Sequence, residues 1–134
     1  MSDDSTTQCL LFPGIFRKPI VARFDQREGS SDGGALLLKA ADRHYGLVAG
    51  LSSCLRDDRQ AGKVDHSLRE LVAQRVFSIA CGYPDANDSA RLSEDPIHQL
   101  LLDRDPIEGR ALASQPTLSR FEMSGGGSRK NGCR

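Results

Sequence analysis

The feature that most constrains the fold of this chain is a helix-start signal followed directly by a dense apolar pattern. Ser67 and Glu70 have the S-x-x-E spacing of a capping box, in which each side chain accepts a hydrogen bond from the other residue's backbone. Apolar residues then recur at helical spacing over a wide face; they are Leu68, Leu71, Val72, Val76, Phe77, Ile79 and Ala80. We therefore predict a buried central helix that begins near Ser67 and ends at Gly82.

The composition favours a helical core. Aromatic residues make up 5% of the chain and tryptophan is absent, so the core must consist of Leu, Val, Ile and Ala side chains. A length of 134 residues suits one modest domain, because single domains commonly have about 100 to 150 residues. We predict a mainly α fold: a small helical domain with one short amino-terminal β-strand, incomplete, with disordered termini.

Two helices are predicted before the central one. Ser31 or Asp32 can cap a helix that starts at Ala35 and ends near His44. Gly46 separates it from a second helical run, and we expect the two helices to form a hairpin. The apolar stripe of the second run consists of Leu47, Val48, Leu51 and Leu55.

Three shorter helical segments are predicted after the central helix. Asp85 can cap a helix over residues 86–92, and Pro96 suits the first turn of another. Pro116 marks the start of a third, which packs through Leu118 and Phe121.

The two ends of the chain have compositions that do not predict helices. Residues 1–19 show no periodicity and are interpreted as a flexible arm, and residues 20–24 begin with β-branched side chains that predict the short strand. Residues 124–134 are Gly-rich and basic, which predicts a disordered tail. The helical region is therefore assigned to residues 20–123.

Charge, hydropathy and cysteine spacing exclude several classes of protein. The 18 basic residues balance the 18 acidic ones, so any contact with DNA must be local. No run approaches the roughly 18 apolar residues of a membrane span, and the acidic start is unlike a signal peptide, so we expect a cytoplasmic protein without a membrane partner. In that reducing compartment we expect free thiols at Cys9, Cys54, Cys81 and Cys133.

Two groups of side chains invite a metal-site interpretation, and the sequence favours other roles for both. Asp85, Asp88 and Asp95 each stand at a predicted helix start, where capping and the helix dipole favour aspartate. The other candidate ligands are His44, His66, His98, Cys54 and Cys81. None of these form a C-x2-C or H-x3-H pair, so we expect no metal site.

Three segments spread along the chain stand out together. The first is Phe24-Asp25 with Ser30-Ser31-Asp32-Gly33-Gly34 and the helix over residues 37–42; the second covers residues 75–89 with Leu92 and Asp95-Pro96; the third covers residues 111–122. In this order they resemble the group 1 DDE transposases of bacterial insertion sequences, which have a long helical amino-terminal region.

The resemblance implies that the full-length family protein has a ribonuclease-H-like core, where three carboxylates hold two divalent metal ions. In that family the first catalytic Asp follows a buried strand downstream of the segment that matches residues 114–122. Here no such strand follows, and beyond Glu122 the sequence departs from the family pattern. The resemblance thus implies an amino-terminal fragment that is not itself an enzyme. We expect Mg²⁺ for the full-length family and no cofactor for this fragment.

Within the family resemblance, the segment before Glu122 is the strongest candidate for contacts with DNA. Its polar side chains can reach phosphates or base edges from a helix amino terminus; they are Ser114, Gln115, Thr117, Ser119 and Arg120. A capped helix that packs through Leu118 and Phe121 explains the same segment without DNA.

A helix-turn-helix is a weaker candidate for DNA binding. It would use the central helix and the short helix after it, with Arg69, Arg75 and Arg91 facing DNA. The acidic residues Asp85, Asp88 and Glu94 have the wrong sign for contact with phosphate.

The resemblance thus implies a truncated transposase whose helical region recognises transposon ends or holds two copies together. The alternative is a small helical protein-interaction module without DNA binding, which the zero net charge favours.

Overall fold

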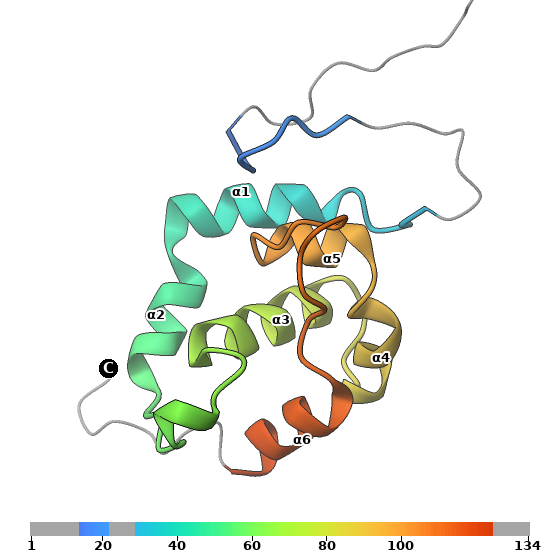
Figure 1. The fold of residues 1–134 in the computed structure, drawn as a ribbon. Coiled ribbons are helices and arrows are strands. Elements are labelled where there is room, and N and C mark those ends of the chain that lie inside the picture. Colours follow the sequence, from blue (N-terminus) through green and yellow to red (C-terminus); the bar gives the residue numbers. More distant parts are fainter. Residues whose placement is uncertain (1–13, 22–28, 125–134) are drawn as a thin grey trace, which may run out of the picture.

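The computed structural model describes residues 14–21 and 29–124. Six α-helices follow one another within these residues, and they enclose a small core (Figure 1). They are α1 (Ala35–Tyr45), α2 (Leu47–Cys54), α3 (Leu68–Ala80), α4 (Ser89–Leu92), α5 (Pro96–Leu101) and α6 (Gln115–Met123), with short 3-10 helices at Ala61–Lys63 and Ala86–Asp88. The mainly α prediction is confirmed. Ile20 and Val21 form no strand, and residues 22–24 of the predicted strand lie outside the described residues.

Helix α3 crosses the middle of the molecule and starts at the predicted capping box (Figure 1). The Glu70 amide donates to Ser67 Oγ at 3.2 Å, and the Ser67 amide donates to Glu70 Oε2 at 2.7 Å. Beyond the helix, Gly82 adopts a φ of +92°, a conformation that favours glycine and turns the chain away. Both ends of the central helix therefore follow the sequence prediction.

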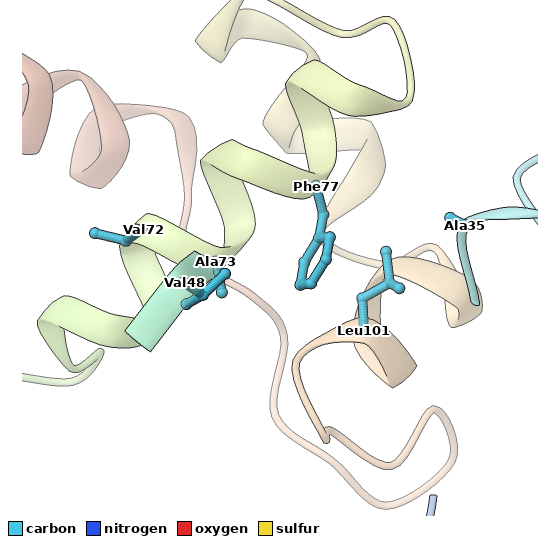
Figure 2. Packing of buried hydrophobic residues seen from close by; sticks show 6 residues of the cluster. All are labelled: Ala35, Val48, Val72, Ala73, Phe77 and Leu101. Carbon is cyan, nitrogen blue, oxygen red and sulfur yellow. The ribbon is translucent and has the colours of Figure 1, made fainter. Parts of the chain in front are cut away.

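Side chains from four helices form the main core around α3. Figure 2 shows Phe77 of α3 and Leu101 of α5 facing each other, with Val48 of α2 close to Ala73. Full burial of a side chain such as Phe or Leu stabilises a fold by about 1.5 to 3 kcal/mol. The cluster consists of Ala35, Val48, Val72, Ala73, Phe77 and Leu101.

The predicted core face of α3 is wrong at Ile79 and Ala80, which are exposed, and it omits three buried residues, Ala73, Gln74 and Ser78. Ile79 is 54% exposed, whereas Gln74 and Ser78 are buried. These polar residues are tolerated because their hydrogen bonds are satisfied: Ser78 Oγ donates to the Gln74 carbonyl at 2.6 Å, and the Gln74 amide bonds to another segment.

Helices α1 and α2 do not form the predicted hairpin. Helix α1 packs on α5, whereas α2 turns away from α1 and packs on α3 (Figure 1). Gly46 at the bend has a φ of +68°, and the Asp42 carboxylate accepts from the Val48 amide at 2.8 Å. In the predicted stripe Val48 is buried and Leu55 packs partly buried against the same core, while Leu47 and Leu51 are exposed.

Part of the predicted amino-terminal arm contacts the helical core. Ile15 is 4% exposed and packs in a cluster with Leu36 of α1 and Leu100 of α5. Lys18 Nζ lies 2.6 Å from Asp105 Oδ2, and this hydrogen bond holds the pKa of the Asp105 carboxyl well below its usual value. Residues 14–18 are therefore tied to the segment after α5.

None of the described helices combines the length and the hydropathy that crossing a lipid bilayer requires.

Candidate nucleic-acid interface

Two buried side chains, Gln74 of α3 and Leu118 of α6, fix helix α6 to the core. The Gln74 side chain donates to the Ala113 carbonyl at 2.9 Å and accepts from the Ala113 amide at 3.1 Å. Leu118 is 1% exposed and packs with Leu71, Ala86 and Ala113. The start of α6 consequently has a defined position relative to α3.

The first turn of α6 has no side-chain cap. Ser114 occupies the N-cap position, but its side chain accepts no backbone hydrogen bond and instead lies 3.1 Å from Thr117 Oγ1. The burial of Leu118 confirms the packing interpretation of this helix, whereas the side-chain cap that this interpretation expected is absent, because the Ser114 hydroxyl pairs with Thr117. Within this turn Pro116 has no N–H, and the Thr117 amide donates to the Ser114 carbonyl at 3.0 Å.

The five predicted contact residues of α6 fall on two faces. Ser114, Thr117 and Arg120 line an open cleft of about 700 Å³. Gln115 and Ser119 do not line it; Gln115 Nε2 donates to Ser119 Oγ at 3.0 Å. The structure thus brings three of the five side chains together at one surface and places the other two outside it.

The cleft is bordered mainly by basic side chains. Arg59 and Lys63 come from the loop before α3, Arg110 comes from the segment before α6, and Arg120 comes from α6 itself. Among the described residues, Asp65 is the one acidic side chain in the lining. The roles of Arg59, Lys63 and Arg110 were not predictable from the sequence, because no local pattern shows that the loop and the later segment meet.

Some of these charges have partners within the protein. Asp57 Oδ1 lies 2.7 Å from Arg59 Nε, and Asp65 Oδ1 lies 3.8 Å from Arg110 Nη2. Arg110 and Asp65 are 72% and 80% exposed, so that pair is open to water and weak. Arg120 Nε donates to the Pro116 carbonyl at 3.2 Å, which orients its guanidinium along α6.

Burial lowers the pKa of His66, which also lines the cleft. A histidine with a pKa below 6.5 is mostly uncharged at neutral pH. His66 therefore offers the cleft a hydrogen-bonding ring, and the positive charge comes from the arginines and Lys63.

The predicted helix-turn-helix is not supported by the geometry. Helix α4 has four residues, Ser89–Leu92, which is too short to serve as a recognition helix. Arg75 donates to the Pro84 carbonyl at 2.8 Å and forms an ion pair with Glu122. Arg91 lies over the Tyr83 ring, 5.1 Å from its centroid. Two of the three arginines are thus engaged in contacts within the fold.

The aspartates at the predicted helix starts occupy N-cap positions, as expected. Asp85 accepts from the Asn87 amide at 2.9 Å, and Asp95 Oδ1 accepts from the amides of Ile97 and His98 at 2.8 and 3.3 Å. Asp88 stands at the N-cap of α4 without a side-chain cap.

The predictions of a helix cap at Asp32 and of a free thiol at Cys54 are both wrong. Gly34 is the N-cap of α1, and the Asp32 carboxylate instead lies 2.8 Å from His98 Nε2. Cys54 is disulfide-bonded, whereas Cys81 is a free cysteine as predicted. Local sequence does not reveal either pairing, because each depends on the tertiary fold.

Comparison with known proteins gives one informative match. No curated protein and no solved structure matches the chain. A family model described as transposase DDE domain group 1 matches residues 12–129. The match passes Glu122, so the predicted departure from the family pattern at that residue is wrong. Because the match covers most of the chain, this protein belongs to the group 1 family of DDE-domain transposases.

Proposed function

We propose that this chain binds the DNA ends of an insertion sequence through the cleft beside α6. The observation that carries the proposal is the convergence of four basic side chains on one open cleft, against a single described acidic one. They are Arg59, Lys63, Arg110 and Arg120. Arginine and lysine bind phosphate through charge-assisted hydrogen bonds, and these contacts dominate affinity for DNA.

The start of α6 supplies the second part of the proposed interface. The positive end of the helix dipole favours an anion here. Pro116 has no N–H and the Thr117 amide donates to the Ser114 carbonyl, so the contribution comes from the dipole and the side chains. The hydroxyls of Ser114 and Thr117 line the same cleft and can donate to phosphate oxygens. We assign direct contact to Ser114, Thr117 and Arg120, and an indirect role to Gln115 and Ser119, which bond to each other.

The proposed role is DNA binding without strand cleavage by the described residues. DDE chemistry requires carboxylates that hold Mg²⁺, an ion that prefers oxygen ligands. Among residues 14–21 and 29–124, the one group of three potential ligands is Asp32, Cys81 and His98. With one carboxylate, a thiol and an imidazole, this group does not fit Mg²⁺. We propose that the carboxylates of a catalytic triad lie outside the described residues. We also propose that the chain acts in the cytoplasm.

A second candidate function is association with another protein or another copy of this chain. Large apolar side chains are exposed on the two consecutive helices α1 and α2. They are Leu37, Tyr45, Leu47 and Leu51, exposed by 57%, 79%, 54% and 42%. Sedimentation of the chain over a range of concentrations tests this candidate: a monomer at every concentration excludes self-association.

Titration of the full chain against labelled DNA tests the proposed DNA binding. The probe is a duplex of the element's own terminal sequence, with a scrambled duplex of equal length for comparison. We expect tighter binding to the terminal duplex and a loss of affinity between about 50 and 200 mM salt, because counterions are released when phosphates are neutralised.

Charge-removing variants locate the interface. Arg120→Ala and Lys63→Ala are each expected to weaken binding and to reduce the salt slope by about 1. Arg69→Ala is the matched control, because Arg69 is an exposed arginine of α3 that does not line the cleft. The proposal fails if Arg69→Ala weakens binding as much as Arg120→Ala, or if no duplex binds at low salt.

A further inference from the structure

Three potential metal ligands from distant parts of the sequence meet beside α5. Asp32 precedes α1, Cys81 follows α3, and His98 belongs to α5. One carboxylate oxygen, the sulfur and one ring nitrogen all lie within 4.8 Å of one another. His98 is 1% exposed, and Asp32 and Cys81 are half-buried. The cluster is therefore partly shielded and still open to an ion from solvent.

Neighbouring groups orient these ligands. Tyr83 Oη donates to Asp32 Oδ1 at 3.3 Å, and the Tyr83 ring meets the His98 ring edge-on at a centroid distance of 5.9 Å. The backbone amide of His98 is held by the Asp95 cap at the start of α5. Such outer contacts around metal ligands fix the orientation of the ligand side chains and strengthen metal binding.

We propose that Asp32, Cys81 and His98 form a zinc site with a fourth position open to water or another ligand. A thiolate, an imidazole and a carboxylate are the three ligand types that Zn²⁺ uses in proteins, and three protein ligands with one open position is a common arrangement. Mg²⁺ and Ca²⁺ select oxygen ligands instead, so this site is distinct from the metal centre of DDE chemistry. The inference does not depend on the proposed DNA binding.

The spacing of the ligands suits a tetrahedral ion after small side-chain movements. Ligand atoms at about 2.0 to 2.3 Å from Zn²⁺ lie roughly 3.3 to 3.8 Å from each other. Asp32 Oδ2 and His98 Nε2, now 2.8 Å apart, must separate slightly, while the most distant pair must close from at most 4.8 Å. Zn²⁺ thus replaces the Asp32–His98 hydrogen bond and ties the start of α1 to the end of α3 and to α5.

Cobalt titration of the metal-free full chain tests the site directly. Co²⁺ at a tetrahedral site with a thiolate gives sulfur-to-cobalt charge-transfer absorption and visible bands that an oxygen-only site lacks. We expect one Co²⁺ per chain, displaced by one Zn²⁺, and Zn²⁺ should slow the reaction of Cys81 with a thiol reagent. Absence of the charge-transfer band, or no protection of Cys81 by Zn²⁺, overturns the proposal.

Matched variants identify the ligands. Cys81→Ser should abolish the charge-transfer band, and Asp32→Asn should weaken Zn²⁺ binding at least about tenfold. His66→Gln is the control, because His66 lies outside the cluster, and it should bind Zn²⁺ like the parent chain. Because Cys81 is half-buried, we expect Cys81→Ser to fold. This variant therefore tests the site even if variants of the fully buried His98 do not fold. An unchanged cobalt spectrum in Cys81→Ser assigns the metal to other residues and rejects the site.

Discussion

The side-chain amide of Gln74 forms two hydrogen bonds with the backbone of Ala113, at 2.9 and 3.1 Å, in the buried layer between α3 and the segment before α6. The side chain thereby satisfies both polar groups of a residue that is 1% exposed. This pairing, together with Leu118, determines where α6 begins. It therefore also determines where the cleft residues of α6 meet Arg59 and Lys63 of the loop before α3.

Replacement of Gln74 tests this pairing. Gln74→Leu leaves the amide and the carbonyl of Ala113 buried without partners, so we expect the free energy of unfolding in urea to fall by about 2 to 4 kcal/mol. Gln74→Glu keeps an acceptor for the Ala113 amide but loses the donor to the Ala113 carbonyl. The buried charge and the unpaired Ala113 carbonyl should therefore also destabilise the fold. Gln60→Leu, at an exposed position, is the control and should change stability by no more than about 0.5 kcal/mol. Equal effects of Gln74→Leu and Gln60→Leu would show that the pairing does not stabilise the fold.

The features of the fold that were predictable from the sequence are those that depend on residues close together in the chain. The capping box of α3 joins positions three apart, and the Asp95 cap joins positions two and three apart. These contacts form inside one turn of helix, so residue type and spacing are enough to predict them.

The features that were not predictable depend on distant pairings. Gln74 and Ala113 are 39 positions apart, and Asp32 and His98 are 66 positions apart. Within its own segment each polar residue suggests another role, because Gln74 lies outside the predicted apolar face and Asp32 stands at a helix start. The basic cleft was hidden for the same reason, because Lys63 and Arg120 meet only when α6 packs on α3.

The capping box of α3 provides a second stability prediction. Ser67→Ala removes the acceptor of the Glu70 amide, and loss of an N-cap serine usually costs about 1 kcal/mol. We expect a decrease of that size in the free energy of unfolding, measured by urea denaturation. Ser53→Ala serves as the control, because Ser53 is exposed near the end of α2 and is not a cap. A loss in Ser53→Ala that matches the loss in Ser67→Ala would contradict the assignment.

The Lys18–Asp105 pair predicts a dependence of stability on pH. Hydrogen bonds from Lys18 and from the Ile107 amide lower the pKa of folded Asp105 below its ordinary value of 3.8. The carboxylate therefore stabilises the fold at pH values above 3.8, and this contribution is lost as the pH falls from 3.8 towards the folded pKa.

Asp105→Asn should consequently destabilise the chain at neutral pH, with a difference from the parent chain that narrows as the pH falls below 3.8. Thermal unfolding between pH 2 and pH 7 measures both effects. Asp58→Asn, at an exposed position, is the control. A difference between parent chain and Asp105→Asn that stays constant with pH would refute the assignment.

Asp65 predicts a gain in DNA affinity. It is the one described acidic residue in the cleft lining, and its carboxylate lies 3.8 Å from the Arg110 guanidinium, which it partly neutralises. Asp65→Asn removes a negative charge that repels phosphate and frees Arg110 to contact DNA. Because an exposed pair is worth about 0 to 1 kcal/mol, we expect affinity for the terminal duplex to rise by up to about fivefold at low salt and less at high salt.

Anisotropy titration of the terminal duplex measures this gain, with Asp58→Asn as the charge-matched control. Asp58 is exposed and does not line the basic cleft. If the two variants bind equally well, the gain reflects the net charge of the chain and the cleft is not the contact surface. If Asp65→Asn alone binds more tightly, and the gain disappears when Arg110→Ala is added, then the freed guanidinium of Arg110 contacts the DNA.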